Sequence, residues 1–588
     1  MSELKSTAPY NFVRLNKVVL QPPLADAMNN LQAANTNEAH EQIKAKYKEY
    51  VLKGEKFSGY FDVEVVNKSP LYIGDTLNGK SSFFSDGKNY CIPGSSMRGC
   101  LKNIFKIITN GSMRIGVDGD VDNQTLYYRS FASSHDEFNE EYKREMSITN
   151  SNNNKKGVYK YSAKPGFLVK QGNSFYVCPA ECEVKRVTVE KANIYGKPYF
   201  DWNSDKVTVY TGAIDGKKNI YIIKKPSWNI KYVVSENCLL KYLNDKNRNG
   251  INLIGLNELT TNIDNGYARK GNDSLAILKG AQLYDYIIPC FYVENRGMVK
   301  HFGSGPLYRI PYRKSIGDHI PSGLKEDKVD FADAIFGNKE LWGSRVFFED
   351  LYIKARNGTS VTYPEADAEP MLGPKPTSFQ NYLMTDEEGK SQHWNSSAEL
   401  RGYKLYWHKK CQWKDSRENR ENMDVIKTIA PMKEENHFYG RLRFENLDAV
   451  ELGALAKVFA IGEGNNTCFK LGMGKALGMG SVKIVGKLHL RTKDYFASFL
   501  SKGIEETSYN RFVEIFDSYV CTKLSENEYK LYQERMYELQ LIMDYSLKNA
   551  ADWEERTEYI SINDENKKKL VTDRKPLPLI EDVVGKKK

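Results

Sequence analysis

The sequence predicts an α+β fold, because strand-like and helix-like patterns alternate along it. In YFDVEVVNKSPLYIGD (60–75), apolar residues alternate with acidic ones, as in a strand with one buried face. IPGSSMRGCLKNIFKIITNG (92–111) then carries apolar residues at the 3.6-residue spacing of a helix. The same succession returns near the C-terminal end, where 440–464 predicts a strand and an amphipathic helix and SVKIVGKLHL (481–490) another strand.

The remaining elements follow from local composition. Residues 24–52 contain no Gly or Pro and are rich in Ala, Gln, Glu and Lys, which predicts one or two helices. Residues 206–225 predict a β-hairpin around Asp215-Gly216. Residues 328–351 predict a short helix, a glycine-containing loop and a strand. The chain after 492 is predicted to be helical, with its last 25 residues a loose tail.

Helix starts can be predicted from capping residues. The pair Ser95-Ser96 is expected to cap the helix that carries Met97, and Asn446 to lie at the start of the helix after the 440–447 strand. We divide the chain into an N-terminal, partly helical extension (1–55), the first part of the core (56–109), a β-rich insertion (110–327), the second part of the core with a glycine-rich loop (328–491), and a helical C-terminal extension and tail (492–588).

Composition narrows the class of protein. A net charge of +10 together with 38 tyrosines and 26 phenylalanines suits a polyanion with exposed bases, single-stranded RNA above all, although such a charge can also serve solubility alone. No apolar run approaches the roughly 18 residues of a membrane span and no signal peptide is visible, so we expect a cytoplasmic protein without a membrane partner. The nine cysteines are expected to be reduced, and Cys178 and Cys182 lack the further ligands of a zinc site.

The stretch CFKLGMGKALGMGSVKI (468–484) concentrates four glycines, Gly472, Gly474, Gly478 and Gly480, around Lys475. It is neither a dinucleotide loop nor a P-loop, because it follows a predicted helix, leads into a strand and lacks Gly-Lys-Ser/Thr. Two interpretations stay open. Its amides and the lysine could contact a sugar-phosphate chain, or the loop could be a turn that packs between helix and sheet.

Three motifs carry a family resemblance. IPGSSMRGCLK, with the preceding SPLYIGD, resembles the signature of the RAMP superfamily of CRISPR systems, and LGMGKALGMGSVKI resembles its C-terminal glycine-rich loop. Between them, AIFGN and WGSRVFFEDL resemble a segment of the guide-RNA-binding backbone subunits of type III CRISPR effector complexes. Each motif occurs once, as in the large single-RAMP-domain branch. The resemblance implies one RRM-like (ferredoxin-like) RAMP domain interrupted by a long insertion.

The resemblance also implies a role and partners. The chain would bind the guide RNA (crRNA) in a type III-like complex for antiviral defence, next to target RNA and other CRISPR effector subunits. A helix start at Ser95 and Ser96 with nearby cations is compatible with phosphate binding. Arg345 could contact RNA or pair with Glu349 or Asp350 in the fold. The residues implied in RNA binding by these motifs are Ser95, Ser96, Arg98, Lys102, Arg345, Gly472, Gly474, Lys475, Gly478 and Gly480.

A second strip, VKHFGSGPLYRIPYRKS (299–315), alternates aromatic and basic residues. Tyr308 and Tyr312 could stack on unpaired bases while Arg309 and Arg313 pair with phosphates. RGYKLYWHKK (401–410) has a similar composition. Either stretch could instead be an edge strand with basic residues that prevent aggregation.

Cleavage of RNA is the alternative to binding alone. In cleaving relatives of the resembled family a loop aspartate helps to cut RNA with a divalent metal, and its place falls on Lys80 here. Asp75 is the better remaining carboxylate candidate, and Mg²⁺ would be needed only for such cleavage. His301 could act as the general base of a metal-independent ribonuclease. We expect binding without catalysis and otherwise no cofactor.

Overall fold

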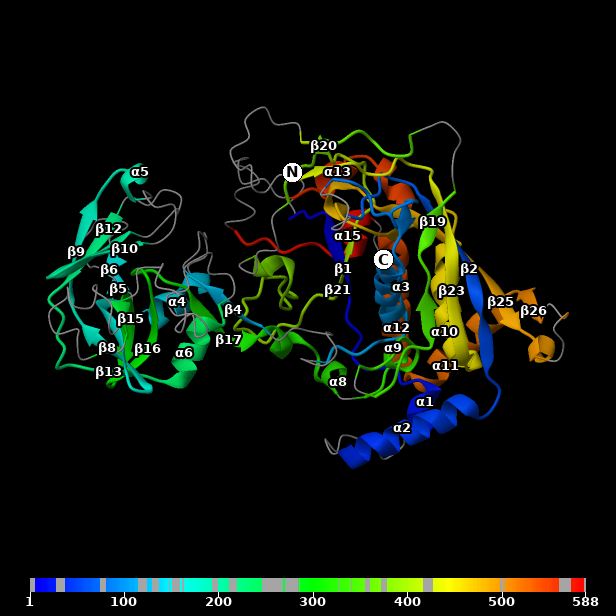
Figure 1. Cartoon of the computed structure of the whole chain (residues 1–588), viewed down its shortest axis with the longest axis horizontal. Coiled ribbons are helices and arrows are strands. Elements are labelled where there is room, and N and C mark those ends of the chain that lie inside the picture. Colours follow the sequence, from blue (N-terminus) through cyan, green and yellow to red (C-terminus); the bar gives the residue numbers. More distant parts are fainter. Residues whose placement is uncertain are drawn as a thin grey trace. The chain divides into compact units, whose positions relative to one another are not determined.

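The structure is a computed structural model with α+β architecture, and it forms two compact units (Figure 1). Unit 1 comprises 1–123, 317–392 and 396–588, and unit 2 comprises 124–316 and 393–395. The main segment of unit 2 lies inside the predicted insertion, 110–327. The structure describes residues 6–27, 37–74, 81–114, 124–129, 137–146, 149–150, 159–160, 163–192, 199–210, 219–245, 268–269, 284, 286–326, 328–339, 341–354, 360–371, 378–415, 427–496, 500, 503–559 and 573–585.

Unit 1 is built on one antiparallel sheet with three long central strands, β2 (Phe57–Asn67), β23 (His437–Leu447) and β25 (Ser481–Arg491). β2 lies between the other two, and Phe61 pairs with Leu442 on one side and Leu488 on the other. The strand order is β24-β25-β2-β23-β19-β3, while β18 also pairs with β23 and β26 with β25. The shorter strands are β3 (Cys91–Ile92), β18 (Val346–Phe348), β19 (Leu351–Ile353), β24 (Phe469–Lys470) and β26 (Ile504–Thr507).

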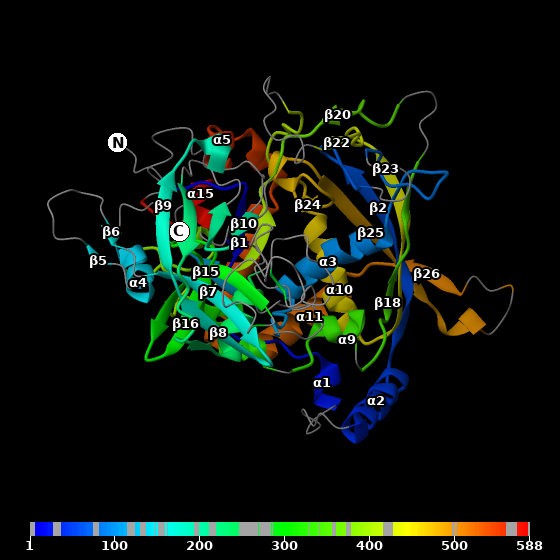
Figure 2. The same cartoon turned by 60° about the vertical axis from the view of Figure 1, so that its left-hand side comes forward.

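Two helices, α3 (Gly94–Ile108) and α10 (Ala449–Gly462), cover one face of this sheet (Figures 1 and 2). The alternation along β2 sends Phe61, Val63 and Val65 into the core beneath them, with Phe61 stacked on Phe459 of α10 at a centroid distance of 4.5 Å. In chain order the core therefore runs β2, α3, β18 and β19, β23, α10, β25. The strand and helix patterns predicted from 60–75, 92–111 and 440–490 are confirmed.

The helical C-terminal part packs behind these helices. α11 (Asn510–Lys523) approaches α10 so closely that a Cβ on Gly453 would lie 2.0 Å from the carbonyl oxygen of Phe512. α12 (Glu526–Ile542) follows directly. The expected helices at the other end are α1 (Pro23–Ala27) and α2 (Asn37–Leu52), preceded by β1 (Tyr10–Val13), which pairs with β21 (Tyr403–Tyr406).

Two sequence expectations about unit 1 are wrong. The last 25 residues are not a loose tail throughout, because within 573–585 Leu577, Ile580 and Val583 are buried and α15 (Ile580–Val584) forms. The helix caps also differ. α3 begins at Gly94 without a side-chain cap from either serine, since the carboxylate of Asp350 accepts the Gly94 amide at 2.7 Å. Asp448, not Asn446, caps α10, because its carboxylate accepts the Glu451 amide.

Unit 2 contains a closed barrel made of five of its described strands. In chain order these are β7 (Lys164–Gln171), β8 (Ser174–Pro179), β13 (Tyr232–Val234), β15 (Tyr286–Asn295) and β16 (Met298–Gly303). The order around the barrel is β7-β8-β13-β16-β15, and β15 closes the ring by pairing with β7. Only the β13–β16 pair is parallel. The helix α6 (Glu236–Leu243) lies between the third and fourth strands in the chain.

A second sheet of unit 2 has the order β10-β11-β12-β9, made of β9 (Glu181–Arg186), β10 (Tyr199–Asn203), β11 (Lys206–Tyr210) and β12 (Asn219–Lys224). β11 and β12 are antiparallel, which confirms the predicted hairpin, whose Asp215-Gly216 turn lies outside the described residues. β4 (Thr125–Tyr128) pairs with β17 (Ile310–Ser315), and α4 (Glu137–Glu145) belongs to the same unit. Within the described ranges, no helix is long and apolar enough to cross a membrane.

Candidate functional site

The start of α3 and the glycine-rich loop are neighbours in unit 1. The thiol of Cys100 lies 3.6 Å from the carbonyl oxygen of Lys470, with Sγ as donor. Burial raises the pKa of this thiol to about 12, and nearby Lys475 opposes that shift, which places the lysine beside α3. Ser95 and Arg98 on α3 and Met473 on the loop are exposed. The two segments with the strongest motif resemblance therefore contribute to one surface.

All four glycines of the loop adopt positive φ, from +69° at Gly474 to +90° at Gly478. The space next to them is filled by the protein itself. A Cβ on Gly480 would lie 1.9 Å from the carbonyl oxygen of Leu471, and one on Gly478 would lie 2.7 Å from that of Lys410. The packing interpretation therefore explains why these positions are glycine.

The amides of the loop are also largely used inside the protein. Met473 donates its N–H to Tyr72, Leu471 to Gly480 and Gly480 to Pro70. The amides of Leu477 and Met479 both donate to the carbonyl oxygen of Gly474. The surface that the loop offers to a ligand is thus made by its side chains, those of Met473 and Lys475, more than by a row of open amides.

Both lysines of the loop, Lys470 and Lys475, are partly exposed, but the ammonium group of Lys470 is held inside the protein. The Lys470 ammonium donates to the carbonyl oxygen of Met479 at 3.0 Å, and desolvation of this ammonium lowers its pKa to about 7. Lys475 lies in a short 3₁₀ turn (Lys475–Leu477) and is half-buried. Lys475 is therefore the cation of the loop that can meet a phosphate.

On α3, Arg98 and Lys102 flank the ring of Phe336. The Arg98 guanidinium donates to the carbonyl oxygen of Phe336 at 2.7 Å and lies 5.9 Å from the ring centroid, and the Lys102 ammonium lies 5.8 Å from it. One anchored N–H leaves a guanidinium with four further donors. Ser95 and Ser96 cap nothing, so their hydroxyls are not committed to the helix end.

Arg345 does not lie on a surface that could meet RNA. Its side chain is 6% exposed and forms a two-pronged ion pair with Glu451, at 2.8 and 2.5 Å. It also donates to the carbonyl oxygens of Ala334 and Asn446. Neither pairing partner suggested by the sequence is used, because Glu349 pairs with Arg443 and the Asp350 carboxylate accepts the Gly94 amide. Arg345 joins the segment before β18 to the start of α10 and is a structural residue.

The strip 299–315 lies in unit 2, and its tyrosines are buried. The Tyr312 ring stacks on that of Tyr128 at 4.2 Å between centroids, and Tyr308 lies next to His301. Buried rings offer no face to a base, so the stacking expected of Tyr308 and Tyr312 does not fit this structure. In the similar stretch 401–410, Tyr403 and Trp407 are buried in the core of unit 1.

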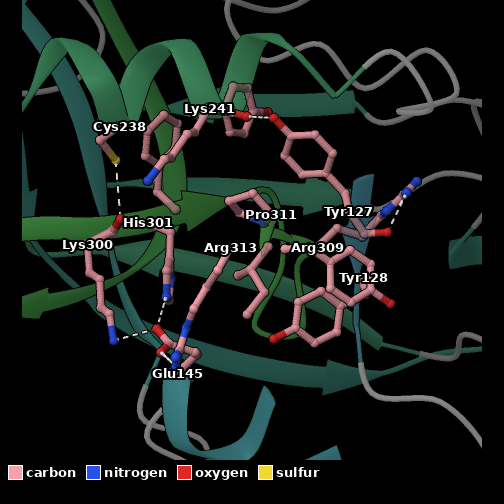
Figure 3. Close-up of a pocket in the computed structure, with 14 residues that line it drawn as sticks. Tyr127, Tyr128, Glu145, Cys238, Lys241, Lys300, His301, Arg309, Pro311 and Arg313 are labelled. Carbon is pink, nitrogen blue, oxygen red and sulfur yellow. Dashed lines mark hydrogen bonds and ion pairs between the residues drawn. The ribbon is translucent and has the colours of Figure 1, made fainter. Parts of the chain in front are cut away.

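The same strip lines a cavity of about 140 Å³ in unit 2, which Figure 3 shows. His301, the proposed general base, is there with Arg309 and Arg313. Burial lowers the pKa of His301, so the ring is neutral near pH 7. Two lining residues that the sequence analysis missed, Lys300 and Glu145, form an ion pair of 2.5 Å. No local sequence pattern could have predicted this pair, because 155 positions separate the two residues in the sequence.

No metal site is visible in the part of the chain that the structure describes, where no three His, Cys, Asp or Glu side chains are grouped to hold an ion. Asp75 and Lys80 lie outside that part, so the carboxylate candidate for cleavage has no geometry to report. Cys178 is buried with its thiol 3.6 Å from the Tyr284 hydroxyl, which fits the expected reduced cysteine.

Comparison with known proteins finds no relative by sequence. No protein family model matches the sequence, and no curated relative does. Among solved structures, a chain in "Cryo-EM structure of the Type III-B Cmr-beta bound to cognate target RNA" is similar over 74% of this chain and 98% of that chain. Its identity to this chain is 9% and its TM-score is 0.17.

Proposed function

We propose that this protein binds single-stranded RNA, as the guide-RNA-binding RAMP subunit of a type III-like CRISPR interference complex in the cytoplasm. Its partners would be the crRNA, target RNA and other effector subunits. The proposal combines the three sequence motifs with the geometry of unit 1. RNA binding is its central claim, and membership of the complex follows from the motif resemblance alone.

The strand order of unit 1 is the observation that carries the proposal. β25, β2, β23 and β19 are neighbours in that order, and α3 follows β2 while α10 joins β23 to β25. Two β-α-β halves interleaved in this way are the arrangement of a ferredoxin-like domain, to which RRM domains that bind RNA belong. This order supports an RRM-like RAMP core, with unit 2 inserted between α3 and β18.

The surface shared by α3 and the glycine-rich loop is the proposed phosphate-binding surface. It presents Arg98, Lys102 and Lys475 as cations and Ser95 as a hydroxyl donor. Cations and hydroxyls fix a polynucleotide by its phosphates without reading its sequence. This suits a protein that must hold guide RNAs of varying sequence.

The barrel of unit 2 adds independent support. Numbered in chain order, its five strands follow one another around the ring as first, second, third, fifth and fourth, and a helix lies between the third and fourth strands in the chain. This is the connectivity of an OB-type barrel, a fold that binds oligonucleotides on its second and third strands. On those strands Tyr176 is half-buried opposite exposed Val233, and the Lys231 ammonium lies 5.6 Å from the Tyr176 ring centroid. An aromatic ring beside a cation can hold an unpaired base.

RNA binding by unit 1 can be tested with the double variant Arg98→Ala/Lys475→Ala. We expect this variant to bind single-stranded guide-repeat RNA more weakly. The slope of log affinity against log salt concentration should also become shallower by about 1.4, because each lost phosphate contact contributes about 0.7. Lys523→Ala is the matched control, since Lys523 is an exposed residue at the end of α11 that pairs with Asp26 of α1, outside both motifs. Unchanged affinity and slope in the double variant would exclude this surface as an RNA-binding site. Glycine variants are unsuitable, because they distort the loop itself.

Cleavage is a second candidate function, and His301 is the observation that favours it. A neutral ring in a cavity with Lys300 and Arg313 has the groups of a general base and phosphate-binding cations. Repeat RNA and guide-complementary RNA should be incubated with the protein, with and without Mg²⁺, beside His301→Ala. Products that disappear in that variant without needing Mg²⁺ would support it. No products in any condition would leave the binding function alone.

A further inference from the structure

The cavity of unit 2 is lined by cations from several segments. Lys241 comes from α6, Lys300 from β16 and Arg313 from β17, while Arg309 precedes β17 (Figure 3). Glu145, at the C-terminal end of α4, is the one carboxylate among the described lining residues. Arg309 already has an acidic neighbour, since it lies 3.7 Å from Asp245. Of the other cations, Lys300 and Arg313 pair with Glu145, and Arg313 also pairs with Glu141 at 2.8 Å.

Glu145 occupies the position that a bound anion would take. Its carboxylate lies 2.5 Å from the Lys300 ammonium, 3.3 Å from the Arg313 guanidinium and 3.9 Å from Nε2 of His301. The C-terminal end of a helix disfavours negative charge, so the cations and not the helix hold the carboxylate there.

His301 presents an unused nitrogen to this group. The Tyr308 hydroxyl donates to the His301 carbonyl oxygen at 3.0 Å, and its oxygen lies 2.9 Å from Nδ1. With the hydroxyl proton so placed, Nδ1 carries the ring proton and Nε2 is an acceptor. Nε2 is buried and makes no hydrogen bond with any described residue. Buried polar atoms nearly always have a partner, so a missing proton donor is indicated.

We propose that this cavity binds a phosphate monoester, the terminal phosphate of a nucleic acid or that of a free mononucleotide, which displaces the Glu145 carboxylate from Lys300 and Arg313. Such a phosphate carries about 1.5 to 2 negative charges near pH 7 and is partly protonated, so it can pair with both cations and donate to Nε2 of His301. Tyr242 and Phe302, stacked at 4.5 Å, provide an apolar wall for the sugar. The inference does not depend on the guide-RNA surface of unit 1.

The test measures binding of inorganic phosphate and of 5′-AMP to the full-length protein by calorimetry. Lys300→Met should weaken binding at least about tenfold, since a charge-assisted contact is lost. Glu145→Gln should tighten it by about tenfold or more, because the internal competitor loses its charge while the side chain keeps its shape. Glu140→Gln on the same helix is the control, since Glu140 is exposed, pairs with Lys143 and does not line the cavity.

Opposite effects of Glu145→Gln and Lys300→Met distinguish an anion site from a structural ion pair, in which both changes would only destabilise unit 2. If Glu145→Gln does not fold, the wild-type protein provides the readout: phosphate should shift the ¹⁵N resonance of His301 Nε2. No such shift, or phosphate binding that Glu145→Gln does not tighten, overturns the proposal. Matched oligonucleotides with a 5′-phosphate, a 3′-phosphate or neither then identify the source of the phosphate. If the ligand is the end of a nucleic acid, one of the phosphorylated oligonucleotides should bind, and if it is a free nucleotide, only 5′-AMP should bind.

Discussion

Arg345 is a cation whose burial decides its role. Its guanidinium is enclosed with Glu451, and desolvation of two charges is compensated only while both are present. Arg345→Met should therefore lower the free energy of unfolding of unit 1 by about 3–5 kcal/mol, because Glu451 would be left buried and unpaired. Urea unfolding checks this.

Arg443→Met is the matched control for Arg345. Arg443 pairs with Glu349 at 2.9 Å, but both side chains are about half exposed, so the loss should stay below about 1 kcal/mol. Equal losses in the two variants would contradict the structural role of Arg345. RNA affinity of the folded Arg345→Met protein should be unchanged, because the side chain does not reach the proposed surface.

Lys470 makes stability depend on pH. Burial lowers its pKa to about 7 in the folded protein, from 10.5 for an ordinary lysine. Between these pH values the unfolded chain binds a proton that the folded protein does not, so the cost of burying Lys470 falls as pH rises. Below pH 7 both states are protonated and the cost is constant.

Lys470→Met removes this dependence. The stability of the variant relative to the wild type should be greatest at pH 7 and below, and should decline by up to about 1.4 kcal/mol per pH unit between pH 7 and 10. The hydrogen bond lost to Met479 shifts the difference by a constant amount and leaves the slope. Urea unfolding at four pH values measures it, and a difference independent of pH would show that Lys470 titrates normally.

Among the elements of unit 1, the glycine-rich loop connects β24 to β25. Gly480→Ala places a methyl group 1.9 Å from the Leu471 carbonyl oxygen at a φ of +71°, so strain and clash together should cost about 2–5 kcal/mol. Gly87→Ala is the control in the same unit, with φ +93° and no atom within 4 Å of the added Cβ, and should cost about 1 kcal/mol. Urea unfolding compares them. If Gly480→Ala and Gly87→Ala lower the free energy of unfolding by similar amounts, the backbone of the loop can move away from the added methyl group at little cost.

The elements show what local sequence determines. The alternation in β2 and the apolar spacing in α3 predicted both elements, since each periodicity reports a buried face. The cap of α10 was misplaced by only two residues, from Asp448 to Asn446, whereas the first amide of α3 binds a distant carboxylate, that of Asp350. Such a partner, some 250 positions away, leaves no trace in the helix's own sequence.

The candidate sites show the same limit. The motifs of α3 and the glycine-rich loop were found from sequence and lie side by side, but which of their residues are exposed depends on packing across unit 1. Tyr308 and Tyr312 have the spacing of a binding strip, yet Tyr128 and His301 cover them. The barrel of unit 2 escaped prediction because its third strand, β13, is only three residues long and the second sheet separates it from β8.

At the scale of the whole molecule, the two ends of the chain meet in unit 1. Arg14, directly after β1, pairs with Glu534 and Glu538 of α12 and, at 3.1 Å, with Glu581 of α15. A C-terminal segment that the sequence predicts to be a loose tail therefore completes a core that begins near residue 10. Its contribution comes from three buried apolar side chains more than from the ion pairs, because Arg14 is partly exposed.

Removing residues 573–588 should consequently destabilise unit 1 by several kcal/mol, since full burial of each aliphatic side chain contributes about 1.5–3 kcal/mol. Ile580→Ala alone should cost about 2–5 kcal/mol, whereas Asp582→Ala, on the exposed side of the same helix, should change stability by less than about 0.5 kcal/mol. Urea unfolding of the three proteins decides the matter. If the truncated chain is as stable as the wild type, α15 contributes nothing to the core. If Ile580→Ala and the truncation lose the same amount, the helix acts through that one side chain.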